Sequence, residues 1–217
     1  MGHHQFRTFE FVRNNAGFIR ATVHCDAPAR IYFVFDEILS DGEVNVTRYS
    51  CANVVTYDLM RAGTYHLESF EPYELKYLKV MVDGGTCELL DLGFREYVNP
   101  DTERATFRSS DPVLNRIFEA ARETFKQNAV DVFTDCPGRE RAGWLCDSFF
   151  IGRVAADLCG NTDMERMFFQ NYLLPEHFEA LPKGMLPMCY PADHPNSNYI
   201  PNWAMWFVVQ LEEYLHR

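Results

Sequence analysis

The hydrophobic pattern of this 217-residue chain changes its period near residue 105, so the chain divides there into two parts. Residues 8–98 hold short apolar or alternating runs about ten residues apart, with turn-forming residues between them. From residue 110 onward, apolar residues recur at helical spacing instead. We therefore predict an α+β chain with two segregated parts, residues 1–105 and residues 106–217.

The first part has the pattern of an antiparallel β-sandwich. Short strands separated by turn signals, such as Asn14-Asn15 and Asp83-Gly84-Gly85, are typical of that fold. The expected strands are Phe18–Val23, Ile31–Phe35, Val54–Leu59, Tyr65–Phe70 and Leu75–Val82. We interpret this part as a structural accessory domain, and a sugar-binding module remains the alternative.

The second part predicts four helices that alternate in character. Asp111-Pro112 is a good helix start, and the next residues place an apolar stripe on one face only. The stripe consists of Val113, Leu114, Ile117, Phe118, Ala121 and Phe125. Trp144–Cys159 has few polar residues, so most of its circumference should be buried, and Gly160 should end it.

The same alternation then repeats. Asp163–Leu174 is half polar, whereas Pro201–Leu215 is apolar nearly all round. An exposed helix followed by a buried one, twice in succession, favours helical hairpins of a double-layered α/α toroid over a four-helix bundle. In such a toroid, the connections 129–143 and 175–200 emerge at the same rim.

Composition limits the classes of partner. A formal charge of −11 argues against nucleic acid or an anionic membrane surface, whereas a neutral ligand such as a sugar is compatible with it. No stretch is apolar enough to span a bilayer, and the first residues lack a secretory signal, which favours a cytoplasmic location. Seven irregularly spaced cysteines indicate reduced thiols rather than a disulfide framework. We expect no cofactor and no metal.

Both connections are rich in chemically active side chains. Long loops on a rigid scaffold commonly carry function. Carboxylates beside aromatic side chains are what glycoside hydrolysis requires, because one carboxyl group protonates the leaving oxygen and another activates water. The relevant residues are Asp131, Asp135, Arg139, Glu140 and Arg141 in the first connection, and Glu176, His177, Glu179, Tyr190, Asp193, His194 and Tyr199 in the second.

The most specific motif is the run Asp135-Cys136-Pro137-Gly138-Arg139-Glu140-Arg141, followed by Trp144 and Asp147. It closely resembles the acidic signature of the α-L-rhamnosidases in glycoside hydrolase family 78. Ser109–Ile117 also resembles the start of that family's helical catalytic domain, and the β part resembles its preceding sandwich. The resemblance spans most of the chain and implies an (α/α)6 toroid that inverts configuration at the anomeric carbon of terminal α-L-rhamnosides.

The resemblance also assigns roles. It makes Glu140 the general acid, Asp135 and Asp147 the carboxylates that hold sugar hydroxyls, and Trp144 a wall of the pocket. Three further candidates for substrate binding are Arg139, Trp203 and Asp193. We expect Arg139 to point away from Glu140 and to pair with another acid.

The general base is the main departure from the family. An inverting hydrolase needs a second carboxylate about 6.5–9.5 Å from the acid, and in these rhamnosidases it lies in a later hairpin. Glu212 and Glu213 should lie at the opposite rim. We therefore expect a fragment that is inactive alone, with an exposed apolar helical face that dimerises through Trp206 and Phe207. A carbohydrate-binding role without turnover and a structural or assembly role remain alternatives.

Overall fold

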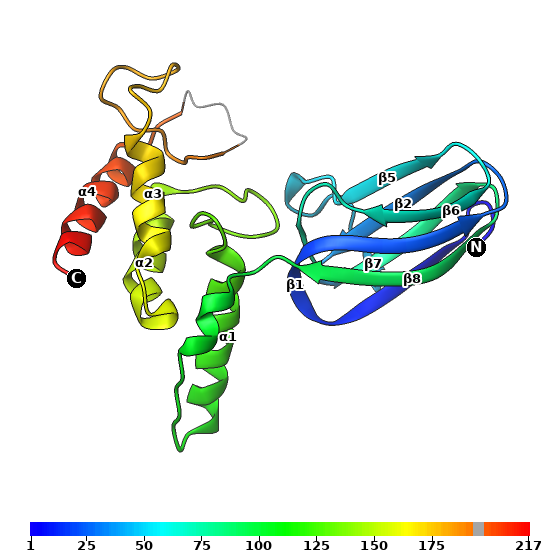
Figure 1. Ribbon diagram of the computed structural model, residues 1–217, viewed down its shortest axis with the longest axis horizontal. Helices are drawn as coiled ribbons and strands as arrows, with labels where there is room; N and C mark the ends of the chain where they lie inside the picture. The colour runs from blue at the N-terminus through cyan, green and yellow to red at the C-terminus, as the bar shows by residue number, and fades with distance from the viewer. Residues whose placement is uncertain (193–197) are drawn as a thin grey trace. The chain divides into compact units, whose positions relative to one another are not determined.

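The computed structural model describes residues 1–192 and 198–217 and divides the chain into two compact units, Met1–Tyr97 and Val98–Arg217. The first unit is built from strands and the second from helices, which confirms the α+β class with segregated parts (Figure 1). The residues between Val98 and the expected boundary at 105 lie in the helical unit. They are tied to its first helix, because the Asn99 amide donates to the Lys126 carbonyl at 2.8 Å.

The β unit is an antiparallel sheet that folds over on itself. Its strand order is β5-β2-β7-β1-β6, and β8 also pairs with β1. The long strand β1 pairs with β7 through its first half and lies between β6 and β8 through its second half. It therefore belongs to both layers, and the expected sandwich is confirmed. The strands are β1 Phe6–Cys25, β2 Ala29–Asp36, β3 Leu39–Ser40, β4 Glu43–Val44, β5 Val54–Leu59, β6 Gly63–Glu68, β7 Tyr73–Gly84 and β8 Cys87–Glu96, with a 3-10 turn η1 at Arg48–Ser50.

The core of the β unit follows from the two-residue period of its strands. In the second half of β1, Ile19, Ala21 and Val23 are buried while Arg20 and His24 face outward. Alternate residues of β2 and β7 cover the same core. The inward residues of those two strands are Ile31, Phe33, Phe35, Leu75, Leu78, Val80 and Val82.

Two expectations for the β unit were wrong. Asn14-Asn15 is not a turn between strands but a bulge within β1, where the register with β7 shifts. The strand β8 was not expected, because the adjacent Leu89 and Leu90 break the alternation of its sequence. It is held by its pairing with β1 over almost its whole length.

The expectation that all cysteines are reduced was also wrong. Cys25 on β1 and Cys87 on β8 are register partners and form a disulfide. Strand pairing brings them together across 62 residues of sequence, a separation that no local spacing could indicate.

The helical unit contains the helices that the sequence predicts. Asp111 caps the first helix by accepting from the Val113 amide at 2.8 Å, and Gly160 ends the second in a left-handed conformation with φ 71°. Aromatic side chains, among them Phe168, Tyr172 and Phe207, fill its core. The elements are η2 Pro100–Arg104, α1 Pro112–Asn128, α2 Leu145–Cys159, α3 Asp163–Leu173 and α4 Pro201–Leu215.

The burial of three helices is lower than expected. In the stripe of α1 only Phe125 is buried, whereas Val113, Leu114 and Ile117 are about half exposed. The helices α2 and α4 were expected to be buried almost all round, yet one side of each is exposed. The described helices leave these apolar sides uncovered. The side chains concerned are Phe150, Val154, Met205, Val208 and Val209.

Candidate functional site

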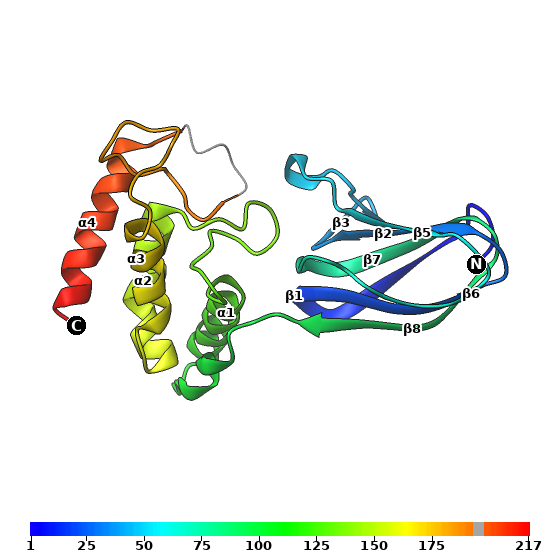
Figure 2. The ribbon, with the colours of Figure 1, turned by 45° about the horizontal axis from the view of Figure 1, so that its top comes forward.

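The site lies where the connection between α1 and α2 meets the connection between α3 and α4. We call residues 129–143 the acidic loop and residues 175–200 the second connection. Backbone hydrogen bonds join them, from the Gly143 amide to the Pro191 carbonyl at 3.2 Å and from the Tyr190 amide to the Gly143 carbonyl at 3.0 Å. Both emerge at the same end of the helices (Figure 2), so the expectation of a shared rim is confirmed.

Gly143 is the point of closest approach between the two connections. A Cβ atom on this residue would lie 2.5 Å from the Tyr190 carbonyl oxygen, so only glycine fits. The buried Tyr172 hydroxyl, from α3, donates to the Gly143 carbonyl at 2.7 Å. Sequence reasoning missed Tyr172, because nothing in the helical pattern of α3 distinguishes it from the other aromatic residues of the core.

Asp135 closes the acidic loop at its base. Its amide donates to the Ala142 carbonyl, and its Oδ1 accepts from the Ala142 amide, both at 3.2 Å. The residues between them form a turn, in which the Cys136 sulfur accepts from the Glu140 amide at 3.4 Å. Glu140 is thereby held on a short, closed turn rather than on an open loop.

The carboxylate of Glu140 is about one quarter exposed and pairs with its neighbour Arg139, whose Nη2 lies 2.7 Å from Glu140 Oε1. The expectation that Arg139 points away and pairs with another acid was therefore wrong. The two side chains are brought together by the tight turn on which both lie. The negative charge of Glu140 is the main cause that raises the pKa of Arg139.

Asp147 lies in the first turn of α2, next to the acidic loop. Burial is the main cause that raises its pKa, and the negative charge of Asp135 adds to the effect. A hydrogen bond from its own backbone amide acts in the opposite direction. The two aspartates therefore lie close enough for their charges to interact.

The negative charge of the loop also reaches the second connection. Burial, followed by the charges of Glu140 and Asp135, raises the pKa of the Cys189 thiol to about 11. Cys189 forms an isolated antiparallel bridge with Trp144. The acidic residues and Cys189 of the second connection therefore form one electrostatic cluster.

Two tryptophans lie beside this cluster with unused donors. Trp144 precedes α2, and Trp203 lies in the first turn of α4. The indole Nε1 atom of each is buried and has no acceptor among the described residues. Buried donors nearly always have a partner, so these two N–H groups could donate to the hydroxyls of a bound ligand.

Asp135, Glu140, Trp144 and Asp147 thus come from one loop and the start of the helix that follows it. Trp203 begins the helix that follows the second connection. Asp193 lies outside the described residues.

No carboxylate of the acidic loop belongs to a metal-ligand cluster in the described part of the chain. A group that could hold a metal ion occurs in the β unit instead, where His3 Nδ1 lies 2.8 Å from Asp83 Oδ1 and His4 is adjacent. None of the described helices is long and apolar enough to cross a membrane.

Comparison with known proteins shows a family match in the helical unit. Residues 102–216 match the family model of the bacterial alpha-L-rhamnosidase 6 hairpin glycosidase domain. No curated protein sequence is significantly similar to the chain.

Solved rhamnosidase structures are similar over both units. A family 78 rhamnosidase of Bacillus sp. GL1 is 25% identical with a TM-score of 0.81, over 96% of this chain and 21% of that one. A Klebsiella oxytoca rhamnosidase with rhamnose bound is 21% identical with a TM-score of 0.80, over 100% of this chain and 45% of that one. A Streptomyces avermitilis α-L-rhamnosidase complexed with L-rhamnose is 20% identical with a TM-score of 0.62, over 87% of this chain and 18% of that one. The chain thus spans less than half the length of each.

Proposed function

Because this chain belongs to the family of bacterial α-L-rhamnosidase six-hairpin glycosidase domains, we propose that it supplies the acid half of a site that hydrolyses terminal α-L-rhamnosides. The observation that carries this proposal is the closed acidic loop. Hydrogen bonds between Asp135 and Ala142 hold Glu140 on a short turn, and Asp147 and Trp144 lie beside it.

In the proposed reaction, Glu140 is the general acid. Its carboxyl proton passes to the glycosidic oxygen while the bond between that oxygen and the anomeric carbon breaks. A water molecule attacks the anomeric carbon from the opposite face and gives its proton to a second carboxylate, so configuration inverts. The products are the free sugar and the protonated leaving group.

The ion pair with Arg139 opposes this role, because it engages the carboxyl group that would have to face the glycosidic oxygen. We propose that the pair separates when the sugar occupies the site. The contact is exposed to solvent on the Arg139 side, where 46% of the side chain is accessible, so separating it costs little.

The remaining residues bind the sugar. Asp135 and Asp147 accept hydrogen bonds from its hydroxyls, and the unpartnered indole N–H groups of Trp144 and Trp203 donate to its oxygens. The ring of Trp144 supplies an apolar wall. Arg139, once released from Glu140, and Asp193 are further candidates for contact with the substrate.

We propose that the general base comes from outside the described residues. Several carboxylates on α3 and α4 are already bound to cations. Glu165 pairs with Arg217 at 2.6 Å, and Glu213 pairs with Arg153 at 3.3 Å. With no base among the described residues, we expect the chain to bind the sugar but not to turn a rhamnoside over.

Calorimetric titration with L-rhamnose tests the sugar-binding part of this proposal. Asp135→Asn removes the charge but keeps an oxygen that can accept from the Ala142 amide. We expect it to weaken the affinity at least about tenfold, or about 1.4 kcal/mol. The matched control is Asp131→Asn, an exposed aspartate of the same loop, which should bind like the unchanged chain. Equal affinity in both variants would contradict the proposal.

A chromogenic α-L-rhamnoside tests the missing base. We expect no release of the chromophore above the background rate. Turnover that disappears in Glu140→Gln would show that a second carboxylate is present in the chain. It would contradict the proposal that the chain carries only half of the site, but it would support the role of Glu140.

A further inference from the structure

A cavity of about 260 Å³ opens in the β unit at the bulge of β1. Glu10 pairs with Tyr77 and Asn15 pairs with Leu75, so β1 has residues 11–14 where β7 has only Lys76. The extra residues lift β1 away from β7. The bulge is held in place by Asn14, which donates from Nδ2 to Glu74 Oε1 at 2.7 Å.

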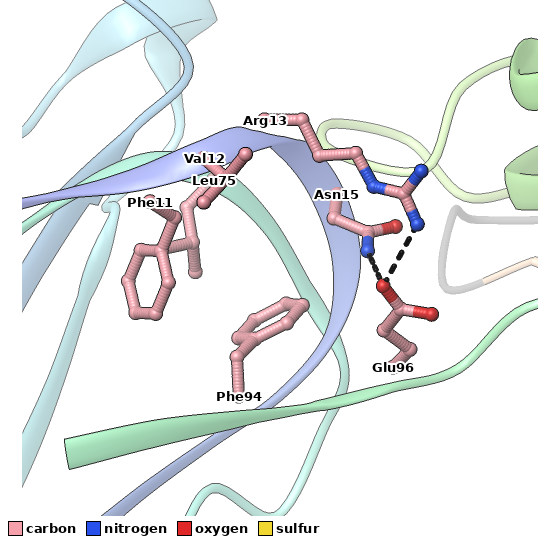
Figure 3. Close-up of a pocket in the computed structure, with 7 residues that line it drawn as sticks. All are labelled: Phe11, Val12, Arg13, Asn15, Leu75, Phe94 and Glu96. Atoms are coloured by element: carbon pink, nitrogen blue, oxygen red, sulfur yellow. Dashed lines mark hydrogen bonds and ion pairs between the residues drawn. The ribbon is translucent and has the colours of Figure 1, made fainter.

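The cavity has an apolar interior and a polar edge (Figure 3). The rings of Phe11 and Phe94 lie 5.8 Å apart and are tilted by 52°, so neither covers the face of the other. The buried Leu75 of β7 also lines the cavity. At the edge, Glu96 Oε1 accepts from Arg13 Nη2 at 3.1 Å and from Asn15 Nδ2.

The charges at this edge argue against an ionic ligand. Arg13 and Glu96 neutralise each other, so neither an anion nor a cation gains a net attraction. Hydroxyl groups suit the edge better, because each can both donate and accept a hydrogen bond. The flat faces of Phe11 and Phe94 suit the C–H faces of a sugar ring.

The size of the cavity limits the ligand further. Sites for drug-sized ligands have volumes of about 300–1,000 Å³, so this smaller cavity has room for a single ring. Val12, at the mouth, is an apolar side chain left fully exposed. Together these features describe a shallow site with aromatic walls, open on one side.

We propose that this cavity is a binding site for a neutral monosaccharide unit, held against the rings of Phe11 and Phe94 and hydrogen-bonded to Asn15, Arg13 and Glu96. The site would let the β unit hold a sugar without turnover. The inference uses residues of the β unit alone and does not depend on the role proposed for Glu140.

Methyl NMR spectra of the whole chain locate such binding directly. The probes are L-rhamnose and D-glucose, each titrated to about 100 mM, and the reporters are the methyl groups of Val12 and Leu75. We expect saturable shifts with a Kd of about 1–10 mM, whereas the methyl groups of Val154 on α2 should not follow the same curve. No shift of Val12 and Leu75 with either sugar overturns the proposal.

Two substitutions test the aromatic wall. Phe94→Leu retains most of the volume but removes the flat face, and we expect it to raise the Kd at least about fivefold. The matched control is Phe18→Leu, a half-buried phenylalanine of β1 outside the cavity, which should leave the Kd unchanged. Equal effects of the two substitutions would overturn the proposal.

A substitution at the mouth of the cavity tests binding with a variant that should keep its fold. Val12 is fully exposed, so Val12→Ser should not destabilise the β unit, and it should weaken the binding seen at Leu75. A sugar-dependent shift of the Trp144 indole signal, with Val12 and Leu75 unmoved, would support the proposed acid half-site and overturn this inference. Shifts of Val12 and Leu75 with an unmoved Trp144 signal would support this inference and contradict the proposed acid half-site.

Discussion

Single side chains fix the shape of the acidic loop more than its own backbone does. Tyr172 reaches from α3 to the Gly143 carbonyl, and the absence of a side chain at Gly143 lets the second connection approach. Asp147 lowers the stability of the fold, because its charge lies in a partly buried position next to Asp135. Residues at functional sites often reduce the stability of the folded state in this way.

Replacing Tyr172 should loosen the loop. Tyr172→Phe removes a buried hydrogen bond to the Gly143 carbonyl, so we expect the free energy of unfolding to fall by about 1–2 kcal/mol. Urea denaturation measures the change. Tyr65→Phe is the matched control, because that hydroxyl also donates to a backbone carbonyl, that of Arg61, but in an exposed position. An equal loss in both variants would contradict the expectation that the buried Tyr172 hydrogen bond contributes more to stability than an exposed one.

Replacing Asp147 should stabilise the fold near neutral pH while it weakens sugar binding. Burial raises the pKa of Asp147 above the usual value of an aspartate, so the folded state disfavours the charged form. Asp147→Asn removes that penalty at about pH 7, and we expect a higher Tm there. Below about pH 3.9, the usual pKa of an aspartate, Asp147 is protonated in both the folded and the unfolded state, and the difference should vanish. A Tm difference that grows in acid would contradict the sign of this effect.

At the scale of the elements, α2, α3 and α4 are joined by a buried polar network. Gln210 accepts from the Ser148 hydroxyl at 3.0 Å and donates to Glu165 Oε1 at 3.1 Å. Arg217 binds the same carboxylate oxygen at 2.6 Å. Because Ser148, Glu165 and Gln210 are cut off from water, each depends on its partners for hydrogen bonds, and the network fixes how the three helices pack.

Gly152 leaves space for the network because it has no side chain. A Cβ atom there would lie 2.6 Å from both Gln210 Nε2 and Glu165 Oε1. We expect Gly152→Ala to destabilise the helical unit by about 2–3 kcal/mol, although alanine is the better helix former. Gly93→Ala on β8 is the control, since nothing lies within 4 Å of the added atom, and it should change stability by about 0.5 kcal/mol or less. A stable Gly152→Ala variant would contradict the packing described for α2.

The elements also show what could be predicted from the sequence. The start of α1 and the end of α2 were predicted correctly, because Asp111 and Gly160 act locally on the backbone. Strand β8 and the disulfide from Cys25 to Cys87 were missed because both depend on pairing between distant segments.

The candidate site was predictable only in part. The motif located Asp135 and Glu140 in one connection and Trp144 directly after it, and helix order predicted that the second connection lies beside it. The contact of Arg139 with Glu140 was not predictable, because the fold of a six-residue turn decides it. Glu165 and Gln210 looked like ordinary polar residues of helices, and only the packing of three helices buries them.

At the scale of the whole molecule, the helical unit leaves apolar residues of neighbouring helices uncovered. Phe150 is 57% exposed on α2, and Val208 is 66% exposed on α4. Trp206 packs against Phe149 and Phe150. Phe207, which was expected to take part in dimerisation, is buried in the core at 5% exposure and is not available.

We expect these 217 residues to self-associate through Phe150, Trp206 and Val208. Light scattering at about 10 µM should give a mass above that of one chain, and Phe150→Lys with Val208→Lys should weaken association at least about tenfold. Met60→Lys is the control, since Met60 is an exposed apolar residue of the β unit. A strictly monomeric unchanged chain would contradict the prediction.

The most direct test of the proposed sugar site is the indole N–H signal of Trp144 in ¹H–¹⁵N spectra during titration with L-rhamnose. This N–H is buried without an acceptor among the described residues, so a bound hydroxyl should move its signal strongly. We predict a saturable shift of the Trp144 signal, a smaller one for Trp206, and no Trp144 shift in Asp135→Asn. A Trp144 signal that stays in place at about 100 mM sugar, well above the millimolar range of weak binding, would contradict the claim that the acidic loop is a rhamnose site.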